Sequence, residues 1–305
     1  MTIRLEARAK LNLSLHIAGR AGDFHRITSL MQSLALADRL ECEAAESTSL
    51  SVDDESLANG ANLVWRALAE LEAEVGRPLP MAVRLAKRIP VAAGLGGASA
   101  DAAAVLRAAE LLYGLELEAG RRLAVARRVG SDVPFALRGG TAFVAGTGEE
   151  VVPLAFLGDL EVLLAVPEPP LLTREVYAAW DELAAADPGL RHDDPHGALG
   201  ALRPGRAESL ARLIHNDLLE PAARRAPRIR AILESWRRVT PLCGMSGSGP
   251  TLFALPAGDA EREELERLAR RQGARLFRSR FAPSGLAVLP AGRSGQAAAA
   301  SPSKG

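Results

Sequence analysis

The sequence predicts a two-domain protein of the α+β class. Its 305 residues exceed the roughly 100–200 residues of a typical single domain. Segments in which apolar and polar residues alternate, as in half-buried strands, are interspersed with segments whose apolar residues recur at helical spacing. A second series of such segments begins after Pro153, so we place a domain boundary near residue 155.

The composition is that of an ordinary globular protein, with 48% hydrophobic and 24% charged residues. The 37 basic and 37 acidic side chains cancel, which removes any bulk attraction to nucleic acid or anionic lipid. Cys42 and Cys243 are too few for a disulfide framework or a four-thiolate zinc site. No apolar run is long enough to span a membrane, and polar residues interrupt the segment where a signal peptide would lie. We therefore expect a cytoplasmic protein whose partners are small molecules, and neither nucleic acid nor a membrane.

From Arg8 to Ile17 apolar and polar residues alternate strictly, which predicts a strand. Its polar face carries Lys10 and Asn12, and this face either meets water or lines a cleft. Lysine is rare in the chain, where arginine supplies most of the positive charge. Lys10 stands out for that reason, because a compact ammonium suits phosphate oxygens or a hydroxyl.

The rest of the N-terminal half predicts several further elements. A helix capped by Asn62 should run to Val75, and Ser131 or Asp132 should cap a short helix. The other expected elements are a strand over Met81–Ile89, a long helix that ends at Gly114, a helix over Glu118–Val129 and a hairpin over Thr141–Pro153.

The C-terminal half is expected to alternate between strands and helices as well. The strands are expected at 160–166, 251–255, 275–279 and 285–289, and the helices at 174–186, 207–214, 227–237 and 261–271. Residues 187–207 read as an exposed loop and residues 291–305 as a disordered tail. The expected domains are therefore 1–155 and 156–290, followed by the tail.

The stretch around Gly94–Ala98 lies between a predicted strand and the start of a predicted helix. Its backbone N–H groups can surround a phosphate, and the helix dipole adds positive potential there. No lysine follows the glycines as in a Walker A loop, and the dinucleotide-binding fingerprint is also missing. The alternative is a tight connection that binds nothing.

A second small-residue loop, Gly244–Gly249, favours the binding interpretation, because two such loops can close on one nucleotide. Phosphoryl transfer also needs a group that orients and deprotonates the acceptor hydroxyl, and a cation that offsets charge on the transferred group. Asp132 and Lys10 can supply these two functions. Asp132 can alternatively be a simple helix cap.

Taken together, these blocks resemble the GHMP kinases over roughly residues 7–290. The general pattern is carried by Ala9–Leu13, Pro90–Asp101 and Met245–Gly249. Further blocks resemble the members that act on a cytidine diphosphate-linked alcohol, and these are Gly22–His25 with Ser29–Gln32, Gly130–Phe135 and His215–Leu218.

The resemblance implies an N-terminal domain like domain 2 of ribosomal protein S5, a ferredoxin-like C-terminal domain and an active site between them. It implies transfer of phosphate from ATP, with Mg²⁺, to the 2-hydroxyl of CDP-methylerythritol in non-mevalonate isoprenoid synthesis. Lys10 and Asp132 would be the catalytic pair, and Asn12, Phe24, His25 and Tyr177 would bind the substrate. The implied ATP-binding residues are Pro90, Val91, Ala92, Ala93, Gly94, Leu95, Gly96, Gly97, Ala98, Ser99 and Ala100. Ser99 would be a candidate neighbour of Mg²⁺, and no protein ligand of the metal is assigned.

Two departures from the family pattern carry expectations of their own. Ala98 stands where glycine is common, which requires a negative φ at that position. Phe24 stands where tyrosine is frequent, so stacking on a base survives while a hydroxyl contact is lost.

Rival interpretations remain at this point. A homoserine or mevalonate type of GHMP kinase is disfavoured by Phe24, His25 and Tyr177, and a non-catalytic nucleotide-binding protein is disfavoured by Lys10 and Asp132. His192 and His196 have metal-ligand spacing, but Pro195 disfavours the helix that would align them.

Overall fold

The structure, a computed structural model, describes residues 1–186 and 202–290. Its strands are β1 (Thr2–Asn12), β2 (Ser14–Ala21), β3 (Phe24–Ala44), β4 (Ser49–Val52), β5 (Met81–Ala86), β6 (Thr141–Ala145), β7 (Glu150–Pro153), β8 (Glu161–Val166), β9 (His215–Asn216), β10 (Cys243–Met245), β11 (Leu252–Ala254), β12 (Arg275–Ala282) and β13 (Leu286–Leu289). Its α-helices are α1 (Leu63–Val75), α2 (Gly97–Tyr113), α3 (Ala119–Val129), α4 (Val133–Arg138), α5 (Thr173–Ala186), α7 (Leu219–Arg225), α8 (Pro227–Arg237) and α9 (Asp259–Arg271). Short 3₁₀ turns cover Glu55–Leu57 and Ala207–Leu210.

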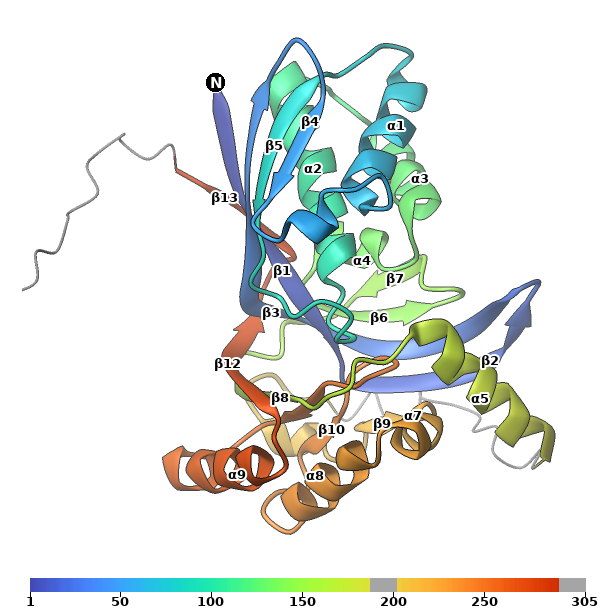
Figure 1. Ribbon diagram of the computed structural model, residues 1–305, viewed down its shortest axis with the longest axis vertical. Helices are drawn as coiled ribbons and strands as arrows, with labels where there is room; N and C mark the ends of the chain where they lie inside the picture. The colour runs from blue at the N-terminus through green and yellow to red at the C-terminus, as the bar shows by residue number, and fades with distance from the viewer. Residues whose placement is uncertain (187–201, 291–305) are drawn as a thin grey trace, which may run out of the picture.

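Figure 1 shows two regions stacked along the long axis of the molecule. In the upper region α1 to α4 pack together on one side of β1, β3, β4 and β5, and in the lower region α8 and α9 lie below β8 and β12. The strand β3 connects the regions, since it pairs with β1, β5 and β6 above and with β12 below. The last strand, β13, returns to the upper region and pairs with β1.

Three large apolar clusters and a small one around Phe135 form the core of the described residues. One lies between the upper strands and their helices, and a second lies between the lower strands and α5, α7, α8 and α9. In the second cluster Trp236 is fully buried, and its indole Nε1 donates a hydrogen bond of 2.9 Å to the carbonyl oxygen of Leu265. The third cluster joins residues from both regions, such as Leu11 and Leu34 with Phe253 and Phe281. This joint fixes the position of β1 relative to the lower region.

Most of the predicted elements are confirmed, including α1 with its Asn62 cap, α2 with Gly114 in the left-handed conformation, and the hairpin of β6 and β7. The predicted strand over Arg8–Ile17 is instead two strands separated at Leu13. The helix predicted over Ala207–Ile214 is wrong, because only one 3₁₀ turn forms before the chain pairs with β2 as β9. Predictions that fall on residues 187–201 and 291–305, including His192 and His196, lie outside the described residues.

The prediction missed β3, β4, β9, β10 and α7. The reason is clearest in β3, where Leu30, Gln32, Ser33 and Leu34 are all buried. A strand that is buried on both faces loses the alternation by which strands are found in a sequence.

The mixed content of strands and helices confirms the predicted α+β class. The boundary near residue 155 stays a prediction. Within the part of the chain that the structure describes, no helix is both long and apolar enough to cross a membrane.

Candidate active site

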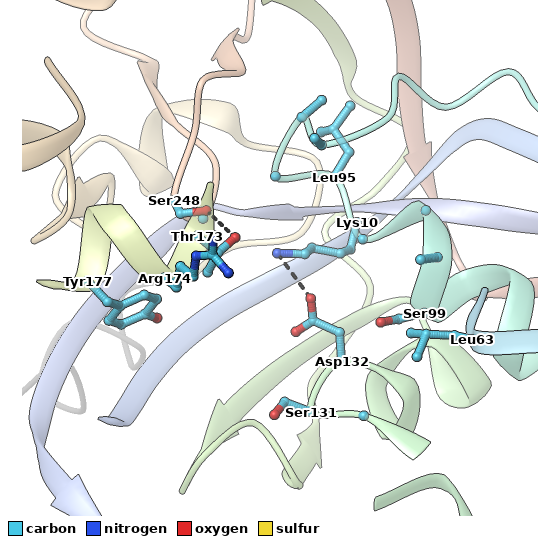
Figure 2. Close-up of a pocket in the computed structure, with 18 of the residues that line it drawn as sticks. Lys10, Leu63, Leu95, Ser99, Ser131, Asp132, Thr173, Arg174, Tyr177 and Ser248 are labelled. Carbon is cyan, nitrogen blue, oxygen red and sulfur yellow. Dashed lines mark hydrogen bonds and ion pairs between the residues drawn. The ribbon is translucent and has the colours of Figure 1, made fainter. Parts of the chain in front are cut away.

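A single large pocket of about 1060 Å³ contains most of the predicted site residues. It is lined by strand ends and loops from both regions, and among its residues are Lys10, Asn12, Phe24, His25, Asp132 and Tyr177 together with the loop from Pro90 to Ser99. In the view of Figure 2, Lys10 and Asp132 lie at the centre, with Tyr177 of α5 on one side and Ser99 of α2 on the other.

Lys10 is held in place by the end of β1. It is only 8% exposed, and its ammonium Nζ donates a hydrogen bond of 2.5 Å to Oδ1 of Asn12. The amide of Asn12 in turn donates to Ser29 Oγ at 2.8 Å, which fixes its orientation. The polar face of this strand therefore lines a cleft, and the alternative that it meets water is wrong for these two residues.

Asp132 precedes α4, but its carboxylate does not cap that helix. Its Oδ2 instead lies 3.5 Å from Nζ of Lys10, and its side chain is about one third exposed, at 32%. The two groups that the sequence assigns to catalysis thus form an ion pair inside the pocket. The carboxylate stays accessible to a bound hydroxyl because it makes no capping hydrogen bond to the start of α4.

The first glycine-rich loop is built for close backbone approach. Gly94 and Gly96 both have φ near +70°, at +74° and +70°, which favours glycine. A Cβ on Gly96 would lie 2.8 Å from Cγ of Lys10, and the backbone N–H of Lys10 donates to the carbonyl of Leu95 at 2.9 Å. The loop and Lys10 therefore fit each other without room for a side chain at Gly96.

The loop leads directly into α2, whose first residue is Gly97. The N-cap residue Gly96 provides no side-chain hydrogen bond, so no side chain of the cap competes for the first N–H groups of the helix. Ala98 is in the first turn of α2, so the negative φ expected for it is confirmed. Ala100, which we expected to bind ATP, is 1% exposed and packs into the core beneath the loop.

The second small-residue loop, which follows β10, contacts the first. The hydroxyl of Ser246 donates to the carbonyl of Gly94 at 3.1 Å, and a Cβ on Gly94 would lie 2.6 Å from the carbonyl oxygen of Ser246. Asn216 of β9 supports this loop by donating to the carbonyls of Met245 and Gly247, both at 2.8 Å. The two loops therefore contact each other and both line the pocket, while their closing on one nucleotide stays a prediction.

The other end of the pocket is aromatic and lies between α5 and the hairpin of β2 and β3. Phe24 is 65% exposed there. The imidazole of His25 stacks on Tyr177 with ring centres 4.7 Å apart and meets the edge of Trp180 at 5.7 Å. Burial raises the pKa of Tyr177, and the nearby carboxylates of Asp132 and Asp217 add to this effect.

Sequence reasoning missed Asp181, whose carboxylate accepts a hydrogen bond from Nε2 of His25 at 2.8 Å and pairs with Arg20 through its other oxygen. It also missed Thr173, whose hydroxyl hydrogen-bonds at 2.9 Å to that of Ser248 in the predicted second loop. No motif surrounds Asp181, and its contact with His25 joins residues 156 positions apart, so nothing in the sequence pointed to it.

A buried charge cluster lies beneath the first loop and was also missed. Nζ of Lys87 contacts Oδ2 of Asp38 at 2.5 Å and Oδ2 of Asp101 at 2.6 Å. The other oxygen of Asp38 accepts hydrogen bonds from the backbone N–H groups of Arg88 and Ile89, at 2.5 and 2.8 Å. Burial raises the pKa of Asp101 to about 8, with Lys87 opposing and Asp38 adding to the shift. The rarity of lysine, which drew attention to Lys10, was an available signal for Lys87 as well.

A separate group of side chains, His16, His215 and Asp217, places possible ligand atoms within 4.8 Å of one another. The two imidazole rings stack with planes 13° apart. Since ring-nitrogen lone pairs lie in the ring planes, the two rings in this arrangement do not point at a common ion.

Cys42 and Cys243 are free and buried, and burial raises the pKa of their thiols to about 12 and about 11.

Comparisons with known proteins agree with this geometry. The family model "GHMP kinases N terminal domain" matches residues 62–140, and "GHMP kinases C terminal" matches residues 198–275. The chain therefore belongs to the GHMP kinase family, which confirms the predicted two-domain architecture, and it is a transferase. A crystal structure of homoserine kinase from Cytophaga hutchinsonii shares the fold, with a TM-score of 0.74 at 18% identity over 94% of this chain and 97% of that one.

Two relatives with higher sequence identity than the homoserine kinase share one name. A protein named 4-diphosphocytidyl-2-C-methyl-D-erythritol kinase from Thermoanaerobacter sp. (strain X514) is 36% identical over 83% of this chain and 87% of its own length. One of the same name from Nocardia farcinica (strain IFM 10152) is 35% identical over 92% of this chain and 94% of its own. A crystal structure of 4-(cytidine 5'-diphospho)-2C-methyl-D-erythritol kinase has a TM-score of 0.74 at 32% identity, and covers 91% of this chain and 98% of that one.

Proposed function

We propose that this kinase transfers the γ-phosphoryl group of ATP to the 2-hydroxyl of 4-diphosphocytidyl-2-C-methyl-D-erythritol, a step in non-mevalonate isoprenoid synthesis. The observation that carries the proposal is the ion pair of Lys10 and Asp132, 3.5 Å long, between a glycine-rich loop on one side and an aromatic pocket end on the other. The similarity to relatives of that name over most of the chain supports the choice of substrate.

In this proposal Asp132 is the general base. Its carboxylate takes the proton of the 2-hydroxyl while that oxygen forms a bond to the γ-phosphorus. The bond between the γ-phosphorus and the β,γ-bridging oxygen breaks, and ADP leaves with the electron pair. The ammonium of Lys10 offsets negative charge on the attacking oxygen and the transferred group.

ATP would bind along the loop from Pro90 to Ser99, where backbone N–H groups and the N-terminus of α2 suit phosphate oxygens. Magnesium enters as part of the MgATP substrate and neutralises phosphate charge. The hydroxyl of Ser99 faces the same pocket and can contact that ion or its waters. Ala100 is removed from this set, because its side chain points into the core.

The acceptor would bind at the other end, with its base beside Phe24, His25 and Tyr177, and Asn12 near the sugar alcohol. Homoserine and mevalonate have no aromatic ring to stack on these side chains, so this end supports the cytidine-linked substrate over those alcohols. We place the enzyme in the cytoplasm, where its free cysteines stay reduced.

Asp132→Asn tests the proposal, because it preserves shape, removes basicity and disturbs no helix cap. We expect turnover, measured as ADP release, to fall about 10²–10⁴-fold while the dissociation constants of both substrates change little. Asp159→Asn, at an exposed carboxylate paired with Arg280, is the matched control and should be as active as the wild type.

Full turnover of Asp132→Asn would remove the general-base role. A wild-type enzyme that phosphorylates homoserine or mevalonate in preference to the cytidine-linked alcohol would overturn the substrate assignment. An enzyme that binds ATP and turns over none of these alcohols would favour a non-catalytic nucleotide-binding protein.

A further inference from the structure

Asp181 makes two ion-pair contacts at the aromatic end of the pocket, and each uses one carboxylate oxygen. Oδ1 accepts a hydrogen bond from Nε2 of His25 at 2.8 Å, and Oδ2 pairs with the guanidinium of Arg20. Arg20 and His25 lie directly opposite each other in the ladder of β2 and β3, so their side chains leave the hairpin on the same face. One carboxylate on α5 therefore links the two strands of the hairpin.

Three side chains of α5 hold the imidazole ring of His25 in place. Tyr177, Trp180 and Asp181 are spaced so that they share one face of α5. Tyr177 stacks on the imidazole, Trp180 meets it edge-on, and only 10% of the His25 side chain is exposed. The position of the imidazole is therefore fixed by packing, and its rotation about the ring axis is fixed by Asp181.

The same contact selects one tautomer of His25. Partial burial alone would raise the pKa of Asp181, but the hydrogen bonds from His25 and Arg20 outweigh it and lower that pKa, so the carboxyl group is ionised. An ionised carboxylate only accepts hydrogen bonds, and Nε2 must therefore carry a proton. In a neutral imidazole the other nitrogen, Nδ1, is then an acceptor. Among the described residues no group hydrogen-bonds to Nδ1, and His25 lines the pocket.

Arg20 matters because a lone carboxylate beside an imidazole also favours the imidazolium, in which both nitrogens donate. The guanidinium on the second oxygen of Asp181 offsets that charge. Asp181 therefore orients the ring through the hydrogen bond to Nε2, while Arg20 offsets the charge on its second oxygen.

We propose that Asp181 is a positioning residue for base selection, which fixes His25 with Nε2 protonated so that Nδ1 offers an acceptor to the nucleobase. This rests on the proposed function, in which the base lies beside His25. Cytosine carries an amino group, a donor, at the position where uracil carries a carbonyl oxygen. An acceptor nitrogen in the pocket complements the amino group of cytosine and repels the carbonyl oxygen of uracil. The geometry therefore favours cytidine over uridine in the substrate.

The test compares the CDP-linked substrate with its UDP counterpart in wild type, Asp181→Ala and a control, Glu182→Ala. Glu182 is the next residue of α5 and is exposed. In Asp181→Ala we expect KM for the CDP substrate to rise, and the preference for it over the UDP substrate to fall about 10-fold or more. KM for ATP and kcat should stay within about twofold, because Lys10 and Asp132 are untouched. Glu182→Ala should match the wild type.

Equal losses for both pyrimidine substrates, with an unchanged preference, would overturn the proposal, since a purely structural role gives that result. A second measurement needs no variant of Asp181. ¹⁵N NMR of histidine-labelled wild-type enzyme reports which ring nitrogen of His25 carries the proton, and His25→Gln serves to assign the signal. We expect the proton on Nε2 alone, and a proton found on Nδ1 would overturn the proposal. A wild type that does not phosphorylate the CDP substrate would overturn the proposed function instead, while the NMR result would still report on Asp181 and His25.

Discussion

Replacing Lys87 by methionine should destabilise the protein far more than a typical loss of an ion pair. The Lys87 side chain is 12% exposed and contacts two carboxylates, those of Asp38 and Asp101, which are 0% and 3% exposed. Breaking a buried ion pair from one side leaves uncompensated buried charge and costs about 3–5 kcal/mol. The methionine keeps most of the apolar stem, so loss of packing adds little.

The assay is equilibrium unfolding in urea at about pH 9, where the Asp101 carboxyl group, with its pKa of about 8, is mostly ionised. Arg84→Met is the matched control. Arg84 lies on the adjacent strand β5 and pairs with Glu43 at 3.1 Å, but these side chains are 60% and 37% exposed. An exposed pair contributes about 0–1 kcal/mol, so the control should unfold almost like the wild type. We expect the free energy of unfolding of Lys87→Met to be lower than that of Arg84→Met by about 3 kcal/mol or more.

A difference below about 1 kcal/mol between the two variants would refute the reasoning, because it would mean that the carboxylates are not buried as charges. The double variant Lys87→Met with Asp101→Asn gives an internal check. Asparagine has no charge to neutralise, so the second change should recover part of the lost stability instead of adding to the loss.

Three further predictions concern single side chains. Burial holds the pKa of Asp101 at about 8 in the folded protein, above its value of about 3.9 in the unfolded chain. Protonation of Asp101 therefore stabilises the fold, fully below about pH 4, and this contribution is lost as the pH rises towards 8. Asp101→Asn should flatten that decline, as measured by urea midpoints across the range. Gly96→Val should lower turnover about 10-fold or more, because its Cβ would lie 2.8 Å from Cγ of Lys10, whereas Gly120→Ala, with nothing within 4 Å, should not. Phe24→Ala should weaken binding of the CDP substrate by about 1–3 kcal/mol, measured by titration, with ATP binding unchanged; an equal loss of both would point to misfolding.

The sequence predicted those elements of the fold whose signals are local. Asn62 before α1 and Gly114 after α2 act within one turn of their helices, and both were found. The helix expected up to Ile214 was wrong for a nonlocal reason. Ile214 packs against the cluster between the two regions, and the next two residues pair with β2 as β9, so tertiary contacts override the local helical spacing.

The candidate site divides in the same way. Lys10, Asp132 and the two small-residue loops carry short motifs, and the structure brings all of them into one pocket. Asp181, Lys87 and Asp38 carry none, because a carboxylate that orients a histidine or neutralises a lysine needs only to be nearby in space. Lys87 and Asp38 are 49 positions apart, and no spacing rule in a single sequence connects them.

The polar face of β1 shows why a strand pattern alone cannot locate a site. Arg4, Glu6 and Arg8 on this face are half-buried, whereas Lys10 and Asn12 on the same face are buried. The alternation is the same along the whole strand, so the difference comes from what covers its end. There the backbone N–H of Asn12 donates to the hydroxyl of Ser246, 234 residues away, and the second loop closes over Lys10. A shift of one residue in the register of β1 would turn Lys10 into the core and Leu11 into the pocket. The ion pair of Lys10 with Asp132 thus depends on the contacts between the upper and lower regions as much as on β1, the strand that carries the lysine.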